Sequence, residues 1–130
     1  MNLQSNNLQT KKNAKYDLEE RTAKFAETVI DLMRKIPNDS VNKRMIEQVV
    51  GSAGSIGANY CEADDAESKK DFKHKIGIAK KEARETKHWL RMISTANPPS
   101  TEKARQLWQE AKELHLIFNA IVNSIKKIRI

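Results

Sequence analysis

The sequence predicts an all-α protein, an up-down-up-down antiparallel four-helix bundle. Glycine and proline occur only 4 and 3 times in 130 residues, which favours long helices over turns and strands. Four long segments repeat apolar residues at alternating steps of three and four, and none alternates with period two for long enough to build a sheet. Because the breaks between these segments are short, neighbouring helices should run antiparallel.

The first helix is expected near the start of the bundle domain, which we place at residues 16–130, and should end at Pro37. Proline disfavours helix in the residue before it. The positions that should face the core are Leu18, Thr22, Phe25, Val29, Leu32 and Ile36. Residues 1–15 contain three lysines, no acidic residue and no apolar core of a signal peptide. They are predicted to be a disordered, basic N-terminal arm.

The second helix should begin after the turn "PNDS", where Asp39 or Ser40 can cap it. Its predicted core row is Ile46, Val49, Ala53, Ile56, Tyr60 and Ala63. An acidic break, "EADDAES", ends this helix. Ser68 with Asp71 then resembles a capping pair for the third helix.

The third and fourth helices are separated by "STANPPST", and Ser100 or Thr101 can start the fourth. The core row of the third helix is Phe72, Ile76, Ala79, Ala83, Thr86, Leu90 and Ile93. The core row of the fourth is Ala104, Leu107, Ala111, Leu114, Phe118, Ile121, Ile125 and Ile128.

Three glycines in "GSAGSIG" of the second helix need an explanation. No Lys-Ser or Lys-Thr follows them and their spacing is G-x-x-G-x-x-G, so neither a Walker loop nor a dinucleotide fingerprint is present. Each glycine costs a helix about 1 kcal/mol relative to alanine, which close packing of another helix can offset. That helix could belong to the bundle or to another subunit, and we favour a subunit. The predicted oligomer interface is Gly51, Gly54, Gly57, Ala58, Ile78, Trp89 and Met92.

The third helix also carries most of the excess positive charge. The chain has a net charge of +7, and residues 69–91 contain nine basic and three acidic residues. A basic strip on one helix face suits a phosphate backbone, although a solvated, solubilising face is the alternative. No aromatic residue is interleaved in this strip, which argues against base stacking. The candidate nucleic-acid-binding residues are Lys73, Lys80, Lys81, Arg84, Lys87 and Arg91.

Catalytic and metal-binding patterns are weak. Glu85 and His88 match Glu-x-x-His, but a di-metal bundle needs two such pairs and only one exists. His115 is a lone histidine beside a core row and is interpreted as structural. Cys61 is followed by acidic residues at positions 62, 64 and 65, which should raise its thiol pKa. We therefore expect no enzyme activity, no cofactor and no metal.

Localisation follows from two simple features. A single cysteine rules out an intrachain disulfide and fits a reducing compartment. No apolar run approaches the ~20 residues of a membrane span. The expectation is a cytoplasmic protein with no membrane partner.

Several motifs resemble those of a known family. "SIGANYCEADDAESKKDF" (55–72), "KKEARETKHWLRM" (80–92) and "YDLEERTAKFA" (16–26) look like the bacterial intervening-sequence proteins of large-subunit ribosomal RNA. The resemblance covers about residues 16–125. It implies a four-helix bundle assembled as a ring-shaped homopentamer, without an established activity and without catalytic residues. Many members carry a basic residue where this chain has Gly51, so any role of that side chain does not transfer.

This family is in turn similar to accessory proteins of diversity-generating retroelements, which are basic pentameric barrels. That similarity implies RNA or DNA and a reverse transcriptase as partners, with the basic strip as the binding surface. The predicted function is a non-enzymatic, nucleic-acid-binding or ribonucleoprotein accessory protein. A protein–protein scaffold is the alternative, and a metal-dependent bundle enzyme is a remote third.

Overall fold

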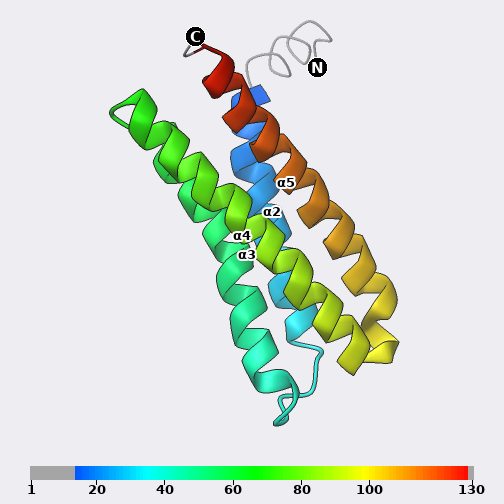
Figure 1. Cartoon of the computed structure of the whole chain (residues 1–130). Coiled ribbons are helices and arrows are strands. Elements are labelled where there is room, and N and C mark those ends of the chain that lie inside the picture. Colours follow the sequence, from blue (N-terminus) through cyan, green and yellow to red (C-terminus); the bar gives the residue numbers. More distant parts are fainter. Residues whose placement is uncertain (1–13, 129–130) are drawn as a thin grey trace, which may run out of the picture.

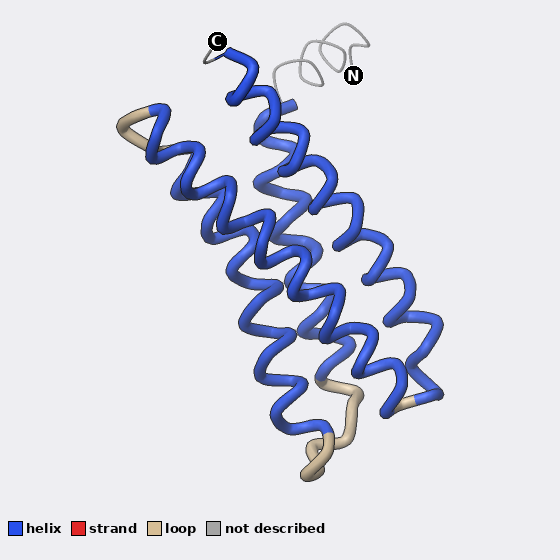
Figure 2. The backbone as a smooth tube through the Cα atoms, in the orientation of Figure 1, coloured by secondary structure: helices blue, strands red, loops and turns tan. Residues whose placement is uncertain are grey.

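The computed structural model describes residues 14–128, which form four long helices in antiparallel order (Figure 1). These are α2 (Ala14–Met33), α3 (Asn42–Asp64), α4 (Lys69–Ala96) and α5 (Thr101–Ile128), with the short 3-10 helix η1 (Pro98–Ser100) before α5. Over this range there is no strand, as Figure 2 shows. The predicted all-α four-helix bundle is confirmed. Within the same range, no helix combines the length and the apolar character of a membrane span.

The helix ends agree with the sequence to within a few residues. α2 begins at Ala14, two residues before the predicted domain start, so most of the predicted N-terminal arm, residues 1–13, lies outside the described residues. The Asp39 carboxylate accepts hydrogen bonds from the backbone N–H groups of Val41 (3.1 Å) and Asn42 (2.9 Å). Ser68 Oγ accepts one from the N–H of Asp71 at 3.0 Å. Both predicted caps are therefore confirmed.

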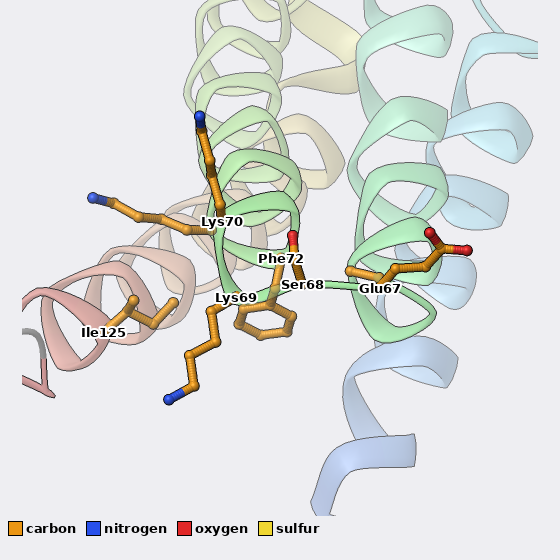
Figure 3. Close-up of a pocket in the computed structure, with 8 residues that line it drawn as sticks. Glu67, Ser68, Lys69, Lys70, Phe72 and Ile125 are labelled. Carbon is orange, nitrogen blue, oxygen red and sulfur yellow. The ribbon is translucent and has the colours of Figure 1, made fainter.

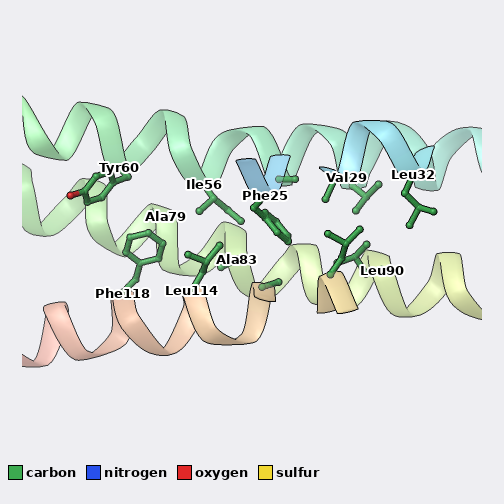
Figure 4. Packing of buried hydrophobic residues seen from close by; sticks show 14 of the residues in the cluster. Phe25, Val29, Leu32, Ile56, Tyr60, Ala79, Ala83, Leu90, Leu114 and Phe118 are labelled. Atoms are coloured by element: carbon green, nitrogen blue, oxygen red, sulfur yellow. The ribbon is translucent and has the colours of Figure 1, made fainter. Parts of the chain in front are cut away.

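The predicted core rows converge along the axis of the bundle (Figure 4). Tyr60 and Phe118 meet there with ring centroids 6.0 Å apart. The α5 row departs from the prediction near its end, because Val122 is buried while Ile121 is only half-buried. A strict seven-residue repeat drifts by about 20° per heptad on a straight α-helix, which moves the core face onto a neighbouring position. The side chain of Ile128 lies outside the described residues.

α3 and α4 pack closely because small residues separate them. Ala53 of α3 and Ala79 and Ala83 of α4 are completely or almost completely buried. The hydroxyl oxygens of Ser52 and Thr86, both buried, lie 2.8 Å apart and share a hydrogen bond between the two helices. Sliding the helices would break this contact, while the contacts of Thr86 Oγ1 with Glu82 O (2.7 Å) and of Ser52 Oγ with Val49 O (3.4 Å) lie within each helix and would remain. The pair therefore favours the observed register by about one hydrogen bond.

A reciprocal amide pair closes one end of the bundle. Asn42 Nδ2 donates to Asn97 Oδ1 at 3.1 Å, and Asn97 Nδ2 donates to Asn42 Oδ1 at 2.8 Å. Both residues are buried, and the same amides also donate to the carbonyl oxygens of Pro37 and Ile93. The start of α3 is thereby tied to the end of α4.

We predict that Asn97→Ala lowers the free energy of unfolding by about 1–3 kcal/mol, because it leaves the buried Asn42 carboxamide oxygen without its partner. Urea denaturation followed by circular dichroism measures the change. Asn38→Ala, at an exposed position, is the control and should change stability by less than about 0.5 kcal/mol. Equal stabilities of the two variants would show that the pair does not stabilise this end.

Candidate nucleic-acid interface

α4 presents two chemically different flanks on either side of its buried row. Lys80, Arg84, Lys87 and Arg91 recur at steps of four, three and four, so they form one row along the helix. The opposite flank lies beside α3, where Glu82 and Glu85 border a cavity of about 350 Å³ together with α3 residues that include Glu47. The buried row thus separates the basic flank from the acidic one.

The basic flank faces a matching row on α5. Arg105, Trp108, Lys112 and His115 follow steps of three, four and three along that helix. The Nζ atoms of Lys87, from α4, and Lys112, from α5, lie 5.5 Å and 5.7 Å from the ring centroid of Trp108. These are cation–π distances. We call the two rows together the basic seam, and its residues are Lys80, Arg84, Lys87, Arg91, Arg105, Trp108, Lys112 and His115.

The side chain of His115 is half-buried and lies near several positive charges of the basic seam. Its pKa is lowered first by burial, and then by the positive charges of Lys87, Lys80 and Arg84. All three cations belong to α4, so the antiparallel packing brings them close to a side chain of α5. Both effects disfavour the charged imidazolium form of His115.

Two acidic residues of α5, Glu110 and Glu113, lie on the side of this helix that faces α2. Arg21 of α2 bonds both carboxylate oxygens of Glu110, at 2.7 Å and 2.8 Å, and Glu113 at 3.2 Å. This bidentate pair joins α2 to α5 and keeps the two carboxylates away from Trp108. Negative charge that would weaken the basic seam is therefore engaged elsewhere.

An open groove runs beside the seam. It has a volume of about 590 Å³ and lies between the C-terminal half of α4 and the start of α5. Its lining residues are Leu90, Arg91, Ser94, Thr95, Ala104, Arg105, Trp108 and Gln109. An aromatic ring, two guanidinium groups and several hydrogen-bonding side chains thus border one accessible space.

Two of the predicted basic residues lie apart from the others. Lys73 borders a cavity of about 1020 Å³ at the far end of the bundle, where Phe72 of α4 and Ile125 of α5 lie on its walls (Figure 3). Figure 1 shows the α3–α4 hairpin diverging from α5 at that end. Lys81 is exposed and lies near Glu82, where its positive charge partly opposes the rise in the pKa of that carboxyl that burial and Glu85 cause. The structure therefore brings together Lys80, Arg84, Lys87 and Arg91 but not all six candidates.

The predicted interface glycines differ in their surroundings. A Cβ added to Gly57 would lie 3.0 Å from Thr22 Oγ1, so the helix that approaches it closely is α2 of the same chain. A Cβ added to Gly51 or Gly54 would meet nothing within 4 Å. Gly54, Gly57 and Ala58 border a groove of about 560 Å³ between α2 and α3. Close packing within the bundle accounts for Gly57, while the faces at Gly51 and Gly54 are open.

The flank of α4 that faces α3 holds the three remaining interface candidates, the half-buried Ile78, Trp89 and Met92. Trp89 Nε1 donates to Glu85 at 3.4 Å, and its ring meets the edge of His88 at a centroid distance of 4.9 Å. The pKa of Glu82 is raised by burial and then by the charge of Glu85. Among residues 14–128, no three His, Cys, Asp or Glu side chains are arranged to hold a metal ion.

Cys61 is a free cysteine on the exposed side of α3. Its thiol donates to Glu19 Oε1 at 3.8 Å, and its pKa is raised by partial burial and then by the carboxylates of Glu19 and Asp64. A raised pKa keeps the sulfur protonated, which is the opposite of what a nucleophilic cysteine requires.

Sequence reasoning missed the half of the basic seam that comes from α5. The signal was present, because Arg105, Trp108, Lys112 and His115 share one spacing row next to the α5 core row. Recognising it required pairing that row with the basic row of α4 across the antiparallel contact. The observation that no aromatic residue is interleaved in the basic strip holds for α4, but the surface that α4 and α5 form together includes Trp108 among the cations.

Comparisons with known proteins identify the family. Residues 14–120 match the family described as 23S rRNA-intervening sequence protein. The chain is also similar to the crystal structure of a protein with unknown function from the S23 ribosomal protein family of Bacteroides thetaiotaomicron. The two share 30% sequence identity and a TM-score of 0.74, over 81% of this chain and 97% of that one. No match was found among curated proteins. The chain therefore belongs to the 23S rRNA-intervening sequence protein family.

Proposed function

We propose that the protein is a non-enzymatic, nucleic-acid-binding or ribonucleoprotein accessory protein that binds through the basic seam. The observation that carries this proposal is the convergence of cations from two helices around His115 and Trp108. A helix face that only keeps the protein in solution does not require its cations to cluster, because separated charges are hydrated equally well. Cations gathered in one place raise the local attraction for a polyanion.

The length of the basic row suits several phosphates of one backbone. From Lys80 to Arg91 the row spans roughly 16 Å, at a rise of about 1.5 Å per residue. Lysine and arginine contacts to phosphates position a nucleic acid without reading its sequence, and they make binding strongly dependent on salt. The family name, which refers to ribosomal RNA, is compatible with such a partner.

The same proposal includes the expected localisation, oligomeric state and partners of the protein. The protein would act in the cytoplasm, as a homo-oligomer, with RNA or DNA bound along the seam. A reverse transcriptase is a further proposed partner, by the similarity to retroelement accessory proteins. The alternative, a protein scaffold, is supported by the half-buried Trp89 and Met92 on the flank of α4 that faces α3.

Removing charge from the basic seam should weaken nucleic-acid binding. We expect the triple variant Lys80→Gln/Arg84→Gln/Lys87→Gln to reduce the slope of log K against log salt by about 0.7–0.9 for each phosphate that the variant no longer binds. Fluorescence anisotropy with labelled RNA and DNA at several salt concentrations measures the slope.

The matched control is Lys43→Gln/Arg44→Gln/Lys103→Gln. It also removes two lysines and one arginine, but from exposed positions outside the seam. Its slope should stay close to that of the unchanged protein. Equal reductions in the two triple variants would mean that only total charge matters. No binding of either nucleic acid at low salt would refute the proposed function.

Binding should also strengthen as pH falls from about 8 to about 5.5, because of His115. In the free protein, burial and then the charges of Lys87, Lys80 and Arg84 lower the pKa of this residue and disfavour its charged form. Bound phosphates would offset the repulsion from Lys80, Arg84 and Lys87, raise the His115 pKa and cause proton uptake on binding. His115→Gln should flatten the pH dependence of the dissociation constant, whereas His88→Gln, on the exposed surface of α4, should retain it. An equal pH dependence in His115→Gln would contradict this role.

For the assembly, we propose that the open face of α3 around Gly51 and Gly54 contacts another subunit of a homo-oligomer, with the homopentameric ring as the expected form. The support is that two glycines, each unfavourable in a helix, have no neighbour within the described chain that would explain them. The half-buried Ile78, Trp89 and Met92 would contribute from α4.

Gly54→Leu should break this oligomer while leaving helicity intact, because the added side chain enters open space in the single chain. Light scattering measures the mass and circular dichroism the helicity. Ala120→Leu, at an exposed small residue of α5 outside the proposed interface, is the control and should leave the mass unchanged. An unchanged mass for Gly54→Leu, or a monomeric unsubstituted protein, would exclude this interface.

A further inference from the structure

We infer that the basic seam takes a single-stranded nucleic acid, with an unpaired base stacked against the indole of Trp108. This inference rests on the proposed function and narrows its ligand to one class. It follows from the position of the Trp108 ring, which lies among cations and beside an open groove. This ring belongs to α5, so the sequence of α4 alone could not have indicated it.

Trp108 packs against the core with part of its side chain and borders open space with the rest. Its side chain is half-buried, and it borders the groove of about 590 Å³ between α4 and α5. Arg91 and Arg105 line the same groove, so a strand entering it would meet a guanidinium group from each helix. An aromatic platform beside cations that follow a backbone is the arrangement by which proteins hold single strands.

Lys87 and Lys112 do not prevent stacking. Their ammonium groups lie 5.5 Å and 5.7 Å from the Trp108 ring centroid at the ends of flexible side chains. A cation–π contact at an accessible site is worth about a two- to fivefold change in an equilibrium constant, whereas base–aromatic stacking is worth about fivefold to about 150-fold. A base can therefore displace an ammonium group, which then turns to the phosphate that follows.

Duplex nucleic acid fits this site less well. The flat faces of paired bases are covered by their neighbours in the stack, so a ring on the protein surface reaches one only if the base is unpaired or extruded. Phosphate contacts alone would serve single strands and duplexes alike. Trp108 therefore favours the single strand.

The second tryptophan provides an internal comparison. Trp89 lies on the opposite flank of α4, where its indole N–H donates to the carboxylate of Glu85. Glu82 lies on the same flank, so this ring has negative neighbours that repel phosphates. Trp89 therefore has acidic neighbours and would be covered by the subunit contact proposed above, whereas Trp108 lies among cations and borders a groove.

The test uses each tryptophan as the control for the other. Trp89→Phe leaves Trp108 as the only tryptophan, and its fluorescence should be quenched by a single-stranded RNA or DNA of about ten nucleotides, within the site sizes usual for such proteins. Trp108→Phe leaves Trp89, which should show no quenching. An oligonucleotide of the same length with abasic sugars in place of its bases should bind without quenching Trp108.

Affinity provides the second readout. Trp108→Ala should weaken single-strand binding by about tenfold or more and duplex binding by less than about twofold, while Trp108→Phe should retain most of the affinity. Because Trp108→Ala removes packing as well, its helicity is checked by circular dichroism, and the quenching experiment does not depend on that variant.

The outcomes separate this inference from the proposed function. If single strands and duplexes bind equally and Trp108 fluorescence does not change, the stacking role is refuted and nucleic-acid binding stands. If no nucleic acid binds at low salt, both fall, and a protein partner for the seam becomes the remaining interpretation. Quenching of Trp89 instead of Trp108 would place the site on the opposite flank of α4 and also refute the inference.

Discussion

The fixed orientation of α4 about its own axis is the constraint on which the rest of the structure depends. It decides where the basic flank and the acidic flank of this helix lie. Its core row from Ile76 to Ile93 is completely buried, and small residues in that row allow α3 to approach closely. The hydrogen bond between Ser52 and Thr86 adds a preference for one register of the two helices. Once α4 is held in this way, its basic flank must lie against α5 and its acidic, partly apolar flank against α3.

Charge segregation follows from this geometry. Glu110 and Glu113 of α5 are bonded to Arg21 on the α2 side, so α5 turns its cations and Trp108 toward α4. Exposed ion pairs contribute little to stability, typically up to about 1 kcal/mol. The consequence for the surface is that two negative charges are held on the α2 side of α5 and not beside the basic seam.

Burial first, and then this segregation of charge, shift the pKa values of His115 and Glu82 against their charged forms. Each is partly buried beside groups of its own sign, His115 beside lysine and arginine and Glu82 beside Glu85. Buried acid–base pairs that neutralise one another would give the reverse shifts. Surfaces with such excess charge are suited to a partner of opposite sign, which would relieve the repulsion.

The glycines of α3 show what spacing along one helix can and cannot predict. Their helical setting could be predicted, because the apolar row runs through them without interruption and no segment with strand periodicity is available to pair. Their neighbours could not, since spacing alone does not say how far apart two helices lie. The structure assigns the space at Gly57 to Thr22 of α2 and leaves Gly51 and Gly54 open, although all three share one sequence pattern.

The sequence by itself determined the four helices, the caps at Asp39 and Ser68 and nearly all of the core, since these depend on periodicity and on side chains within a few residues. It also determined the basic row of α4, which is a property of one helix. Only the tertiary structure decided that Trp108, Lys112 and His115 join that row. They are more than 20 positions away from Lys87 along the chain, and only the antiparallel packing of α4 and α5 places them at its side.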